Sequence, residues 1–375
     1  MRILYYIYSL PVGGAETVVA EYLGQLRQRG AQVLLVQDYR TDSFLTRGLE
    51  EQGIPTVTLW PGSGESKLGQ TAKKAARGVG LYRRFNKVIR EFQPDVIHFH
   101  AFPDHMDRLD FPRSRMFYSF HAALERNLSM LGQKNTALLQ SLSDDGLTFC
   151  GLTADYAKEI GARFHTDRVL CIPNGLDFDR IRSQRYSREE LRSLFGIPED
   201  ALLLGTVGRL HPVKNQERML SILREVQKSR PDARLLIVGA DQAGRADLLR
   251  RQAAELGVAD ALVLAGERRD ADAILAAMDC FLMTSHSEAL PLVAIEAQVQ
   301  GVKCVFSDAV PEDVACQDCV RLSLESPDRA WAEAALKAPV CSGSPKALDG
   351  YNVQTIITKL LDVYSGSCGF SRRIP

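Results

Sequence analysis

Short apolar runs that alternate with longer helical patterns are the feature that most restricts how this chain can fold. Between the runs, stretches such as GAETVVAEYLGQLRQRG (14–30) and NQERMLSILREVQKSR (215–230) place apolar residues at helical spacing. Strands that are apolar almost throughout need helices on both faces, so the pattern predicts an α/β fold with parallel sheets. The strand-like runs lie at 2–8, 31–37, 95–100, 115–120, 202–208, 233–239, 261–266, 280–285 and 303–308.

A turn cluster near the middle of the chain divides this pattern into two series. Its 375 residues exceed the usual size of one domain, and the sequence IPNGLDFDRI breaks the alternation after a strand-like RVLCI. We therefore predict one domain over 1–172 and a second over 173–350. The last helical pattern, YNVQTIITKLLDVYSG, falls in 351–375, where we expect a C-terminal helix and tail that pack back toward the N-terminal domain.

Composition excludes several classes of protein. Hydrophobic residues make up 45% and charged residues 25% of the chain, as in folded soluble proteins. Lys+Arg and Asp+Glu both total 46, so no positive field favours nucleic acid. Because no apolar run reaches 18 residues, we expect no membrane-spanning helix.

The cysteines and the first residues bear on the cell compartment. Eight cysteines lie mostly within apolar segments, as buried reduced thiols do, and they suggest no disulfide framework. The start, MRILYYIYSLPVGGA, has the outline of a signal peptide, but a strand that ends in a Gly-Gly turn explains the same letters better. We predict a cytoplasmic protein.

One segment stands out by charge. Residues 67–90 contain eight basic side chains and no acidic one, with apolar residues such as Leu81, Phe85 and Ile89 between them. A helix of this kind suits an anionic membrane surface, which attracts each basic residue by about 1 kcal/mol. An ordinary solvated basic face is an equally good interpretation of the same residues.

Several common motifs are missing or weak. No G-x-G-x-x-G follows the first strand and no Gly-Lys dipeptide occurs, so neither a dinucleotide fingerprint nor a P-loop is present. The D-x-D matches at 177–179 and 270–272 are no more than chance predicts, and we expect no catalytic metal. Cys316 and Cys319 form a lone C-x-x-C, which we interpret as buried structural thiols because zinc would require a second pair.

Groups that bind phosphates follow two of the predicted strands. Gly13 and Gly14 separate the first strand from a helix, where backbone N–H groups can meet an anion. Arg209 follows the strand at 202–208 directly, and Lys214 comes five residues later, before a helix. A guanidinium and an ammonium flanking one loop suit a diphosphate.

The sharpest signal is the segment MTSHSEALPLVAIEAQVQG, which runs from a strand into a helix that should start near Pro291. Glu288 is expected in the loop at the start of that helix, and Glu296 within it. Eight residues at 1.5 Å each separate the two carboxylates by at most ~12 Å. Two hydroxyl-bearing rings joined by a diphosphate would fit this span, although a capping carboxylate and an incidental helical Glu remain the alternative.

Taken together and in order, these residues resemble a known family. GGAE at 13–16, PNGLD at 173–177, Arg209, Lys214 and the E-x7-E pair Glu288/Glu296 are similar to retaining GT-B glycosyltransferases of the family-4 type. Within that family the likeness is to bacterial capsule and exopolysaccharide transferases. It implies two Rossmann-like domains with parallel sheets facing across a cleft, the acceptor bound by the first and the donor by the second.

The resemblance also implies how the donor's diphosphate is held. Arg209 and Lys214 would contact it, and Gly14 would add a backbone N–H from the other domain. The backbone N–H groups of Leu290 and Leu292 would cap the distal phosphate.

Roles at the transferred sugar follow in the same way. Glu288 would bind the sugar hydroxyls and Glu296 the ribose of the nucleotide. Many relatives have Gly directly after the first Glu, where this chain has Ala289, so donor specificity can differ. His121 matches the family's histidine near the transferred sugar, whereas His98 and His100 are expected to be architectural.

The expected function is therefore metal-independent, retaining transfer of a hexosyl or N-acetylhexosaminyl group without a cofactor. The donor would be a nucleotide diphosphate sugar, with a UDP-sugar favoured, and the acceptor a lipid-linked or polysaccharide glycan of the cell surface. The basic segment would place the enzyme at the inner face of the plasma membrane. A nucleotide-sugar epimerase or hydrolase of the same fold, and a non-catalytic nucleotide-binding module, are the alternatives.

Overall fold

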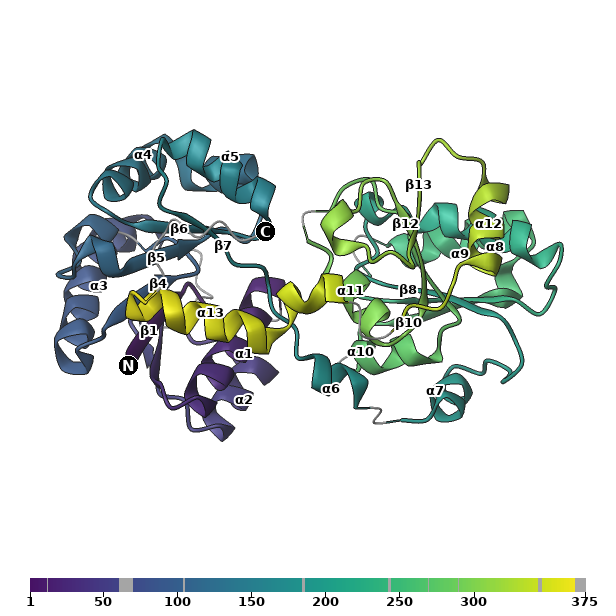
Figure 1. The fold of residues 1–375 in the computed structure, drawn as a ribbon, viewed down its shortest axis with the longest axis horizontal. Helices are drawn as coiled ribbons and strands as arrows, with labels where there is room; N and C mark the ends of the chain where they lie inside the picture. The colour runs from purple at the N-terminus through teal and green to yellow at the C-terminus, as the bar shows by residue number, and fades with distance from the viewer. Residues whose placement is uncertain are drawn as a thin grey trace. The chain divides into compact units, whose positions relative to one another are not determined.

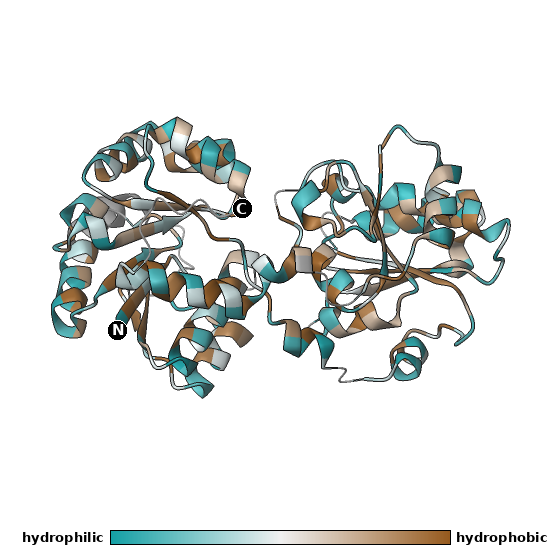
Figure 2. Cartoon of the chain, viewed as in Figure 1, coloured by the Kyte–Doolittle hydropathy of each residue, from teal (hydrophilic) through white to brown (hydrophobic). Residues whose placement is uncertain are grey.

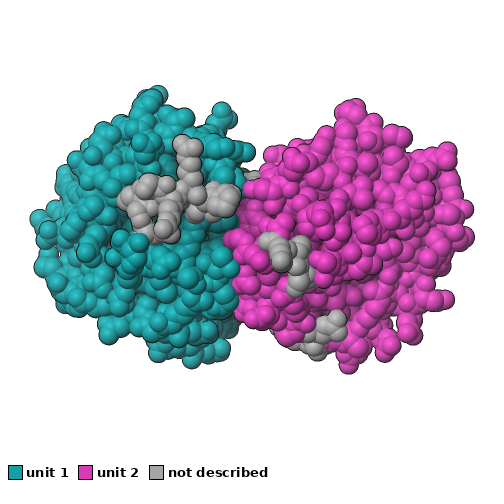
Figure 3. Space-filling model, in the orientation of Figure 1, with its two compact units in different colours: residues 1–175, 353–375 teal, residues 176–352 magenta. Residues whose placement is uncertain are grey.

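The computed structural model divides the chain into two compact units, shown in teal and magenta in Figure 3. Unit 1 comprises Met1–Gly175 and Val353–Pro375, and unit 2 comprises Leu176–Asn352. The predicted boundaries lay at 172/173 and 350/351. The structure describes residues 1–11, 13–60, 70–103, 105–183, 186–241, 244–268, 270–288, 290–342 and 346–367, with the backbone alone for 70–79 and 346.

Unit 1 is built on a parallel sheet whose strand order is β3-β2-β1-β4-β5-β6-β7 in the described part of the chain (Figure 1). The five inner strands are buried over nearly all of their residues, whereas the edge strands β3 and β7 are half-buried. The strands are β1 (Arg2–Ile7), β2 (Gln32–Gln37), β3 (Thr56–Thr58), β4 (Val96–Phe99), β5 (Met116–Ser119), β6 (Thr148–Gly151) and β7 (Val169–Cys171).

Unit 2 has a second parallel sheet, ordered β10-β9-β8-β11-β12-β13 among the residues described. This is the strand order of the doubly wound dinucleotide-binding fold. The strands are β8 (Leu203–Val207), β9 (Arg234–Val238), β10 (Leu262–Gly266), β11 (Cys280–Met283), β12 (Lys303–Ser307) and β13 (Val320–Leu322).

Helices cover both sheets, and the hydrophobic colouring of the strands in Figure 2 marks the core between the layers. Unit 1 contains α1 (Gly14–Gln28), α2 (Phe44–Glu51), α3 (Gln70–Phe92), α4 (Leu124–Asp144), α5 (Ala154–Phe164) and α13 (Val353–Ser365). Unit 2 contains α6 (Phe178–Arg182), α7 (Arg188–Leu194), α8 (Gln216–Gln227), α9 (Arg245–Leu256), α10 (Ala271–Ile274), α11 (Leu292–Val299) and α12 (Asp328–Lys337). The α/β class and the two Rossmann-like sheets predicted from the sequence are confirmed.

Each of the nine predicted strand-like runs contains a strand, because continuous apolar character is what a doubly covered strand requires. The sequence pattern did not single out β3, β6 and β13. Two of these, β3 and β13, are three-residue edge strands that remain half-buried. The third, TFCG in β6, is fully buried but contains Thr and Gly, which dilute the apolar signal.

The C-terminal helix α13 belongs to unit 1, where it contacts α1. Arg29, at the end of α1, donates hydrogen bonds to the side chains of Thr358 (2.6 Å) and Gln354 (2.8 Å). On the buried side of α13, the Tyr364 hydroxyl lies 3.0 Å from that of Tyr5 in β1. The chain therefore returns to complete unit 1 after forming unit 2.

Each sheet has one switch point, where the order of strands along the chain reverses. In unit 1 it lies between β1 and β4, and in unit 2 between β8 and β11. Ligands of open α/β sheets bind outside the carboxyl ends of the strands at such points. The loops after these four strands are therefore where functional residues are expected.

Candidate functional site

In unit 2, the two strands at the switch point lead into the residues that the sequence had singled out. Strand β8 runs into Arg209 and then into the 3₁₀ turn η4 (Pro212–Lys214), and β11 runs into the loop that contains Glu288. Strands β8 and β11 are hydrogen-bonded neighbours, so both loops leave the same edge of the sheet side by side. Residues 74 positions apart in sequence are thereby brought together.

Lys214 and Glu288 form the centre of this site. The Lys214 ammonium lies 2.6 Å from Oε1 of Glu288, and their side chains are 23% and 10% exposed. The Ser285 hydroxyl donates to the same oxygen at 2.6 Å. Among the described residues no hydrogen bond reaches Oε2 of Glu288, so this carboxylate retains an oxygen that can accept from a ligand.

Backbone contacts hold the two loops in register. The Thr284 hydroxyl donates to the carbonyl of Asn215 at 2.8 Å, and the N–H of His286 donates to the carbonyl of Val213 at 2.7 Å. Asn215 has φ +52°, a left-handed conformation that asparagine tolerates better than most residues, and it begins α8. The positions of Lys214 and Glu288 are therefore fixed by the backbone as well as by their ion pair.

Arg209 differs from Lys214 in having no internal partner. Its side chain is exposed, and within the described part of the chain its guanidinium makes no hydrogen bond or ion pair. The backbone around it is fixed, because Gln216 donates to the Arg209 carbonyl at 2.9 Å. The arginine is thus a free cation on a rigid loop, next to a lysine that is already paired.

A close backbone approach shapes the same edge. Gly239, which follows β9, has φ +154°, and a Cβ at this position would lie 2.0 Å from the carbonyl oxygen of Gly208. Only glycine fits there, because both the conformation and the space exclude a side chain. Gly239 therefore allows the segments after β8 and β9 to pack in contact.

Helix α11 begins where the Glu288 loop ends. Pro291 is its N-cap, one position before the helix rather than inside it. The N–H groups of Leu290 and Leu292 find no acceptor among the described residues, as expected at a helix start. Both leucine side chains pack against the core, so the unpaired N–H groups sit on an anchored segment. Ala289 lies outside the described residues.

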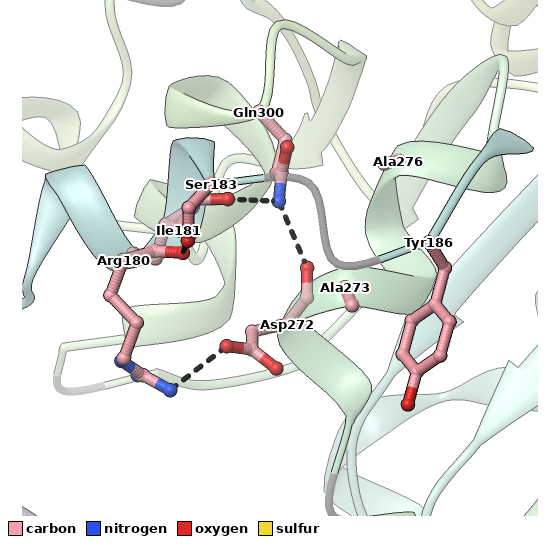
Figure 4. Close-up of a pocket in the computed structure, with 8 residues that line it drawn as sticks. All are labelled: Arg180, Ile181, Ser183, Tyr186, Asp272, Ala273, Ala276 and Gln300. Carbon is pink, nitrogen blue, oxygen red and sulfur yellow. Dashed lines mark hydrogen bonds and ion pairs between the residues drawn. The ribbon is translucent and has the colours of Figure 1, made fainter.

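Glu296 lies within α11, as predicted, but its electrostatic neighbours are residues that the sequence did not indicate. Burial and the nearby carboxylate of Asp272 raise the pKa of Glu296 to about 7, and Arg180 partly offsets this rise. Figure 4 shows the Arg180–Asp272 ion pair (3.0 Å) and Gln300, which donates to the carbonyls of Ile181 and Asp272. No hydrogen bond joins Glu296 to Lys214 or Glu288 in the described structure.

A groove of about 510 Å³ opens beside the same loops. It runs between α8 and α9, and its polar lining can accept and donate hydrogen bonds. The lining residues are Asn215, Glu217, Arg218, Ser221, Gln252, Glu255, Leu256 and His286.

In unit 1, the switch point carries glycines, histidines and the carboxylate of Glu16. Gly13 is the extended N-cap of α1, and a Cβ there would lie 2.3 Å from the carboxylate of Glu16, which folds back over it. Gly14 starts the helix and has open space around its Cα. A ligand can therefore approach the backbone of Gly14 closely.

Three histidines lie on the adjacent strands β4 and β5 or directly after them. His100 and His121 are joined by a hydrogen bond of 2.9 Å, and His98 stacks on His100 with ring centroids 4.4 Å apart. His98 also contacts the hydroxyl of Ser119 at 2.8 Å and that of Tyr364. His98 is fully buried in this network, as its expected architectural role requires, and His121 is the most exposed of the three.

Burial keeps these imidazoles neutral. It lowers the pKa of His98 to about 3 and that of His121 to about 4, and it lowers the pKa of His100 well below its usual value. Nδ1 of His121 and Nε2 of His100 are buried and have no hydrogen-bond partner among the residues that the structure describes. A neutral ring can use such a nitrogen to accept from, or donate to, a bound hydroxyl.

The structure also shows which side chains of the basic segment are buried and which are exposed. The side chains of Leu81, Phe85 and Ile89 are buried in the core of unit 1, whereas Arg83 and Lys87 are exposed. Over residues 80–90 the predicted apolar side is thus packed in the core of unit 1, and the side chains of residues 67–79 lie outside the described part. Within the described residues, no helix combines the length and the apolar character needed to cross a bilayer.

Sequence reasoning missed several residues that support the site. Ser285 and Asn215 are close to the predicted residues in the chain, but polar residues in loops carry no distinctive signal. Asp272 and Arg180 lie far from Glu296 in sequence, so their proximity depends on the fold. Only spatial contact identifies these four residues.

Comparison with known families matches this division. Residues 12–180 match the family model described as Glycosyltransferase Family 4, and residues 187–336 match the model described as Glycosyl transferases group 1. The first match falls almost entirely within unit 1 and the second entirely within unit 2.

Individual relatives are glycosyltransferases. The chain is 32% identical over 230 residues to the putative glycosyltransferase EpsF of Bacillus subtilis, covering 58% of this chain and 59% of that protein. It is 28% identical over 143 residues to an Escherichia coli UDP-Gal:alpha-D-GlcNAc-diphosphoundecaprenol alpha-1,3-galactosyltransferase, covering 38% and 37%. The chain therefore spans less than two thirds of the length of these curated relatives.

Solved structures extend the similarity over nearly the whole chain. The structure of Anabaena HepE in complex with UDP has a TM-score of 0.75 at 20% identity and covers 98% of this chain and 100% of its own. The glycosyltransferase WaaG, involved in lipopolysaccharide biosynthesis, has a TM-score of 0.67 at 18% identity and covers 97% and 100%. With this shared fold and a matching family model in each half, the chain belongs to the family-4 type of GT-B glycosyltransferases.

Proposed function

We propose that this chain is a retaining, metal-independent glycosyltransferase that moves a hexosyl or N-acetylhexosaminyl group from a nucleotide diphosphate sugar, a UDP-sugar in the first instance. The acceptor is a lipid-linked or polysaccharide glycan of the cell surface. Family membership supports transfer, and the named relatives support the substrate classes. The complexes of HepE with UDP and with UDP-glucose support UDP as the nucleotide.

The observation that carries the proposal is the contact between Lys214 and Glu288 at the switch point of unit 2. One loop supplies a cation for the diphosphate and the other a carboxylate for sugar hydroxyls, and they meet at 2.6 Å. A donor molecule presents these two chemical groups side by side. A site that bound only a nucleotide would have no need of the carboxylate.

In the proposed reaction the sugar leaves its nucleotide through an oxocarbenium-like state while negative charge grows on the diphosphate. Lys214, the free Arg209 and the N–H groups at the start of α11 stabilise that charge as preorganised donors. For Lys214 this requires exchange of its contact with Glu288 for one with phosphate. Glu288 then keeps the Ser285 hydroxyl on Oε1 and offers its other oxygen to the sugar.

The remaining residues are assigned more distant roles. Glu296 holds the ribose, and Gly14 donates its N–H to the diphosphate from the loop after β1. His121 contacts the transferred sugar through its unpaired nitrogen. The acceptor binds to unit 1, where the histidines at the switch point are neutral.

We also propose that the enzyme works in the cytoplasm at the inner face of the plasma membrane. Because the apolar side of α3 is buried, binding would be electrostatic, through exposed residues such as Arg83, Lys87 and Arg90. Sedimentation with anionic and neutral liposomes tests this step. Equal binding to both kinds of liposome would contradict it.

A thermal-shift panel with UDP, GDP, dTDP, ADP, CDP and NAD tests the donor class. A ligand at 100 times its dissociation constant stabilises the protein by about 2.7 kcal/mol, which raises the melting temperature of a protein of this size by a couple of degrees or more. We expect UDP to give the largest shift and NAD none. No shift with any nucleoside diphosphate would contradict the donor site.

An assay of nucleotide release then separates a transferase from the alternatives. UDP release from UDP-sugars is measured with and without a diphosphoundecaprenol-linked glycan, with Mg²⁺ and Mn²⁺ omitted. A transferase releases UDP much faster with the acceptor. Equal rates of UDP release with and without the acceptor would indicate a hydrolysing epimerase. Tight binding of the UDP-sugar without any release of UDP would indicate a nucleotide-binding module.

A further inference from the structure

Four cysteines of unit 2 gather into one cluster that no part of the proposed reaction uses. The cluster consists of Cys304 in β12, Cys316 and Cys319 in the loop before β13, and Cys341 after α12. The sulfur atoms of Cys304, Cys319 and Cys341 all lie within 4.8 Å of one another. The sulfur of Cys316 lies 3.6 Å from that of Cys319.

Sheet register explains why these residues meet. Val305 of β12 pairs with Val320 of β13, so the residues just before them, Cys304 and Cys319, lie side by side on neighbouring strands. The C-x-x-C spacing brings Cys316 back to Cys319, and the N–H of Cys319 donates to the Cys316 carbonyl at 3.0 Å. The second pair, which the sequence pattern lacked, thus comes from residues 12 positions before and 25 positions after Cys316.

The cluster is enclosed and held by a further polar residue. Cys304, Cys316 and Cys341 are at most 4% exposed, and Cys319 is partly exposed. Gln298 of α11 accepts from the backbone N–H of Cys316 at 2.8 Å and from the sulfur of Cys319 at 3.1 Å. Its amide in turn donates to the carbonyls of Ala294 (2.7 Å) and Val314 (2.9 Å).

The sulfur–sulfur distances fit one shared metal ion better than a disulfide. A disulfide requires about 2.05 Å, whereas the Cys319 and Cys341 sulfurs lie 4.0 Å apart. Four thiolates around tetrahedral zinc at about 2.3 Å stand about 3.8 Å from one another. The 3.6 Å and 4.0 Å contacts bracket that value. The sulfur of Cys316 lies outside the group of three that are all within 4.8 Å of one another, so it would have to move inward to join a shared ion.

We propose that Cys304, Cys316, Cys319 and Cys341 bind one Zn²⁺ ion as a structural four-cysteine site. Binding displaces the thiol protons to solvent and leaves four thiolates on the metal. Zinc is the metal class because four sulfur ligands in tetrahedral arrangement are its usual structural set. Because Cys319 is partly exposed, the ion can reach the cluster from solvent.

This site would stabilise unit 2 without taking part in catalysis. Cys304 lies in the first half of β12. Ser307, the last residue of that strand, donates to the Ser285 carbonyl in the loop that contains Glu288, at 2.7 Å. Zinc would tie the loop that contains Cys316 and Cys319, and the segment after α12, to the strand. Through Gln298 it would also brace α11, the helix that starts at the donor site.

Metal analysis of the purified full chain tests the proposal. We expect about one zinc per chain by mass spectrometry, and X-ray absorption with four sulfur neighbours at about 2.3 Å. Cobalt substitution should give the intense visible bands of a tetrahedral tetrathiolate. A folded chain that contains less than about 0.1 zinc ion per chain and takes up neither zinc nor cobalt overturns the proposal. Bound iron or copper in place of zinc also overturns it. So does a protein mass two hydrogens lighter, because that mass reveals a disulfide.

Two variants separate this site from buried thiols in general. Cys319→Ser should lower zinc affinity at least tenfold in a competition with a chromogenic chelator, and lower the melting temperature of the zinc-loaded protein. Cys280→Ala, which removes a buried thiol from neighbouring β11, should leave zinc content unchanged. If both variants kept zinc equally, the cluster would not be the binding site. If Cys319→Ser fails to fold, the cobalt spectrum of the unaltered chain still decides.

Discussion

The switch point of unit 2 carries charge, whereas that of unit 1 carries neutral imidazoles. In unit 2, Lys214 and Glu288 meet at 2.6 Å beside the free guanidinium of Arg209. In unit 1, the corresponding loops bring His100 and His121 together at 2.9 Å, with their pKa values lowered by burial. The same fold thus places a cation–carboxylate pair at one switch point and neutral imidazoles at the other.

This difference supports the proposed division of roles between the two units. A diphosphate needs fixed positive charge, and in a cleft of low dielectric such charge stabilises a leaving group effectively. A neutral glycan hydroxyl needs hydrogen-bond partners without a net field. The fold alone therefore specifies where ligands bind, and the side chains at the strand ends specify which ligand.

The largest effect is expected from Glu288→Ala. Loss of the carboxylate should reduce turnover about 10³-fold, the size seen when one preorganised group is removed from an active site. UDP affinity should change less than about threefold, because Lys214 and Arg209 remain. Steady-state kinetics and UDP titration measure the two effects, with Glu333→Ala on the exposed side of α12 as control. A variant that kept most of its turnover would remove Glu288 from the sugar site.

Lys214→Ala should weaken the charged site in a different way. Removal of the ammonium should lower UDP affinity about 10- to 100-fold and turnover as well, because a charge-assisted contact to phosphate is lost. Binding of uridine, which has no phosphate, should hardly change. Calorimetry with both ligands checks this, with Lys337→Ala, a 77% exposed lysine, as the matched control. Equal losses for UDP and uridine would indicate damage to the fold rather than to a phosphate site.

The histidine site of unit 1 should show itself in acid stability. His121 has a pKa of about 4 when folded and about 6.5 when unfolded, so the unfolded chain binds the extra proton first as pH falls. This group therefore destabilises the protein between pH 6.5 and 4. His121→Asn should reduce this loss of unfolding free energy on acidification by about 2 kcal/mol, a value that is discounted because the side chain is partly exposed.

Urea unfolding at pH 7.5 and pH 5 measures this effect. His165→Asn is the control, because His165 is exposed and its left-handed backbone conformation suits asparagine. If both variants had the same acid sensitivity as the original chain, the neutral state of His121 in unit 1 would be refuted.

The smallest effect, of opposite sign, is expected at Glu296 in unit 2. Its pKa is about 7 when folded and about 4.5 when unfolded, so the folded chain keeps the proton and loses stability as pH rises from 4.5 to 7. Glu296→Gln should therefore be about 1–2 kcal/mol more stable than the original chain at pH 8 and equal to it below pH 4.5. Unfolding curves across this range measure the difference, with Glu333→Gln as control. They would show no such divergence if the folded pKa of Glu296 were the ordinary value of about 4.5.

The sequence alone determined the fold class, most of the strands, and which candidate loops follow those strands. Apolar runs such as that at 280–285 are doubly covered whatever the details of packing, and the loop after such a strand lies at the ligand-binding edge. For this reason Lys214 and Glu288 could be named before their contact was known. Short edge strands such as β13 were not identified, because three half-buried residues leave no clear pattern.

Only the tertiary structure decided which side chains meet across long separations in sequence. Burial raises the pKa of Glu296, Asp272 adds to that rise and Arg180 partly offsets it. Cys304 and Cys341 complete a cluster of which the sequence showed only the C-x-x-C half. The apolar pattern of a strand is a local property, because it depends only on residues that are neighbours in sequence. Contacts between distant residues depend on strand order and register, and these are fixed only when the whole unit packs.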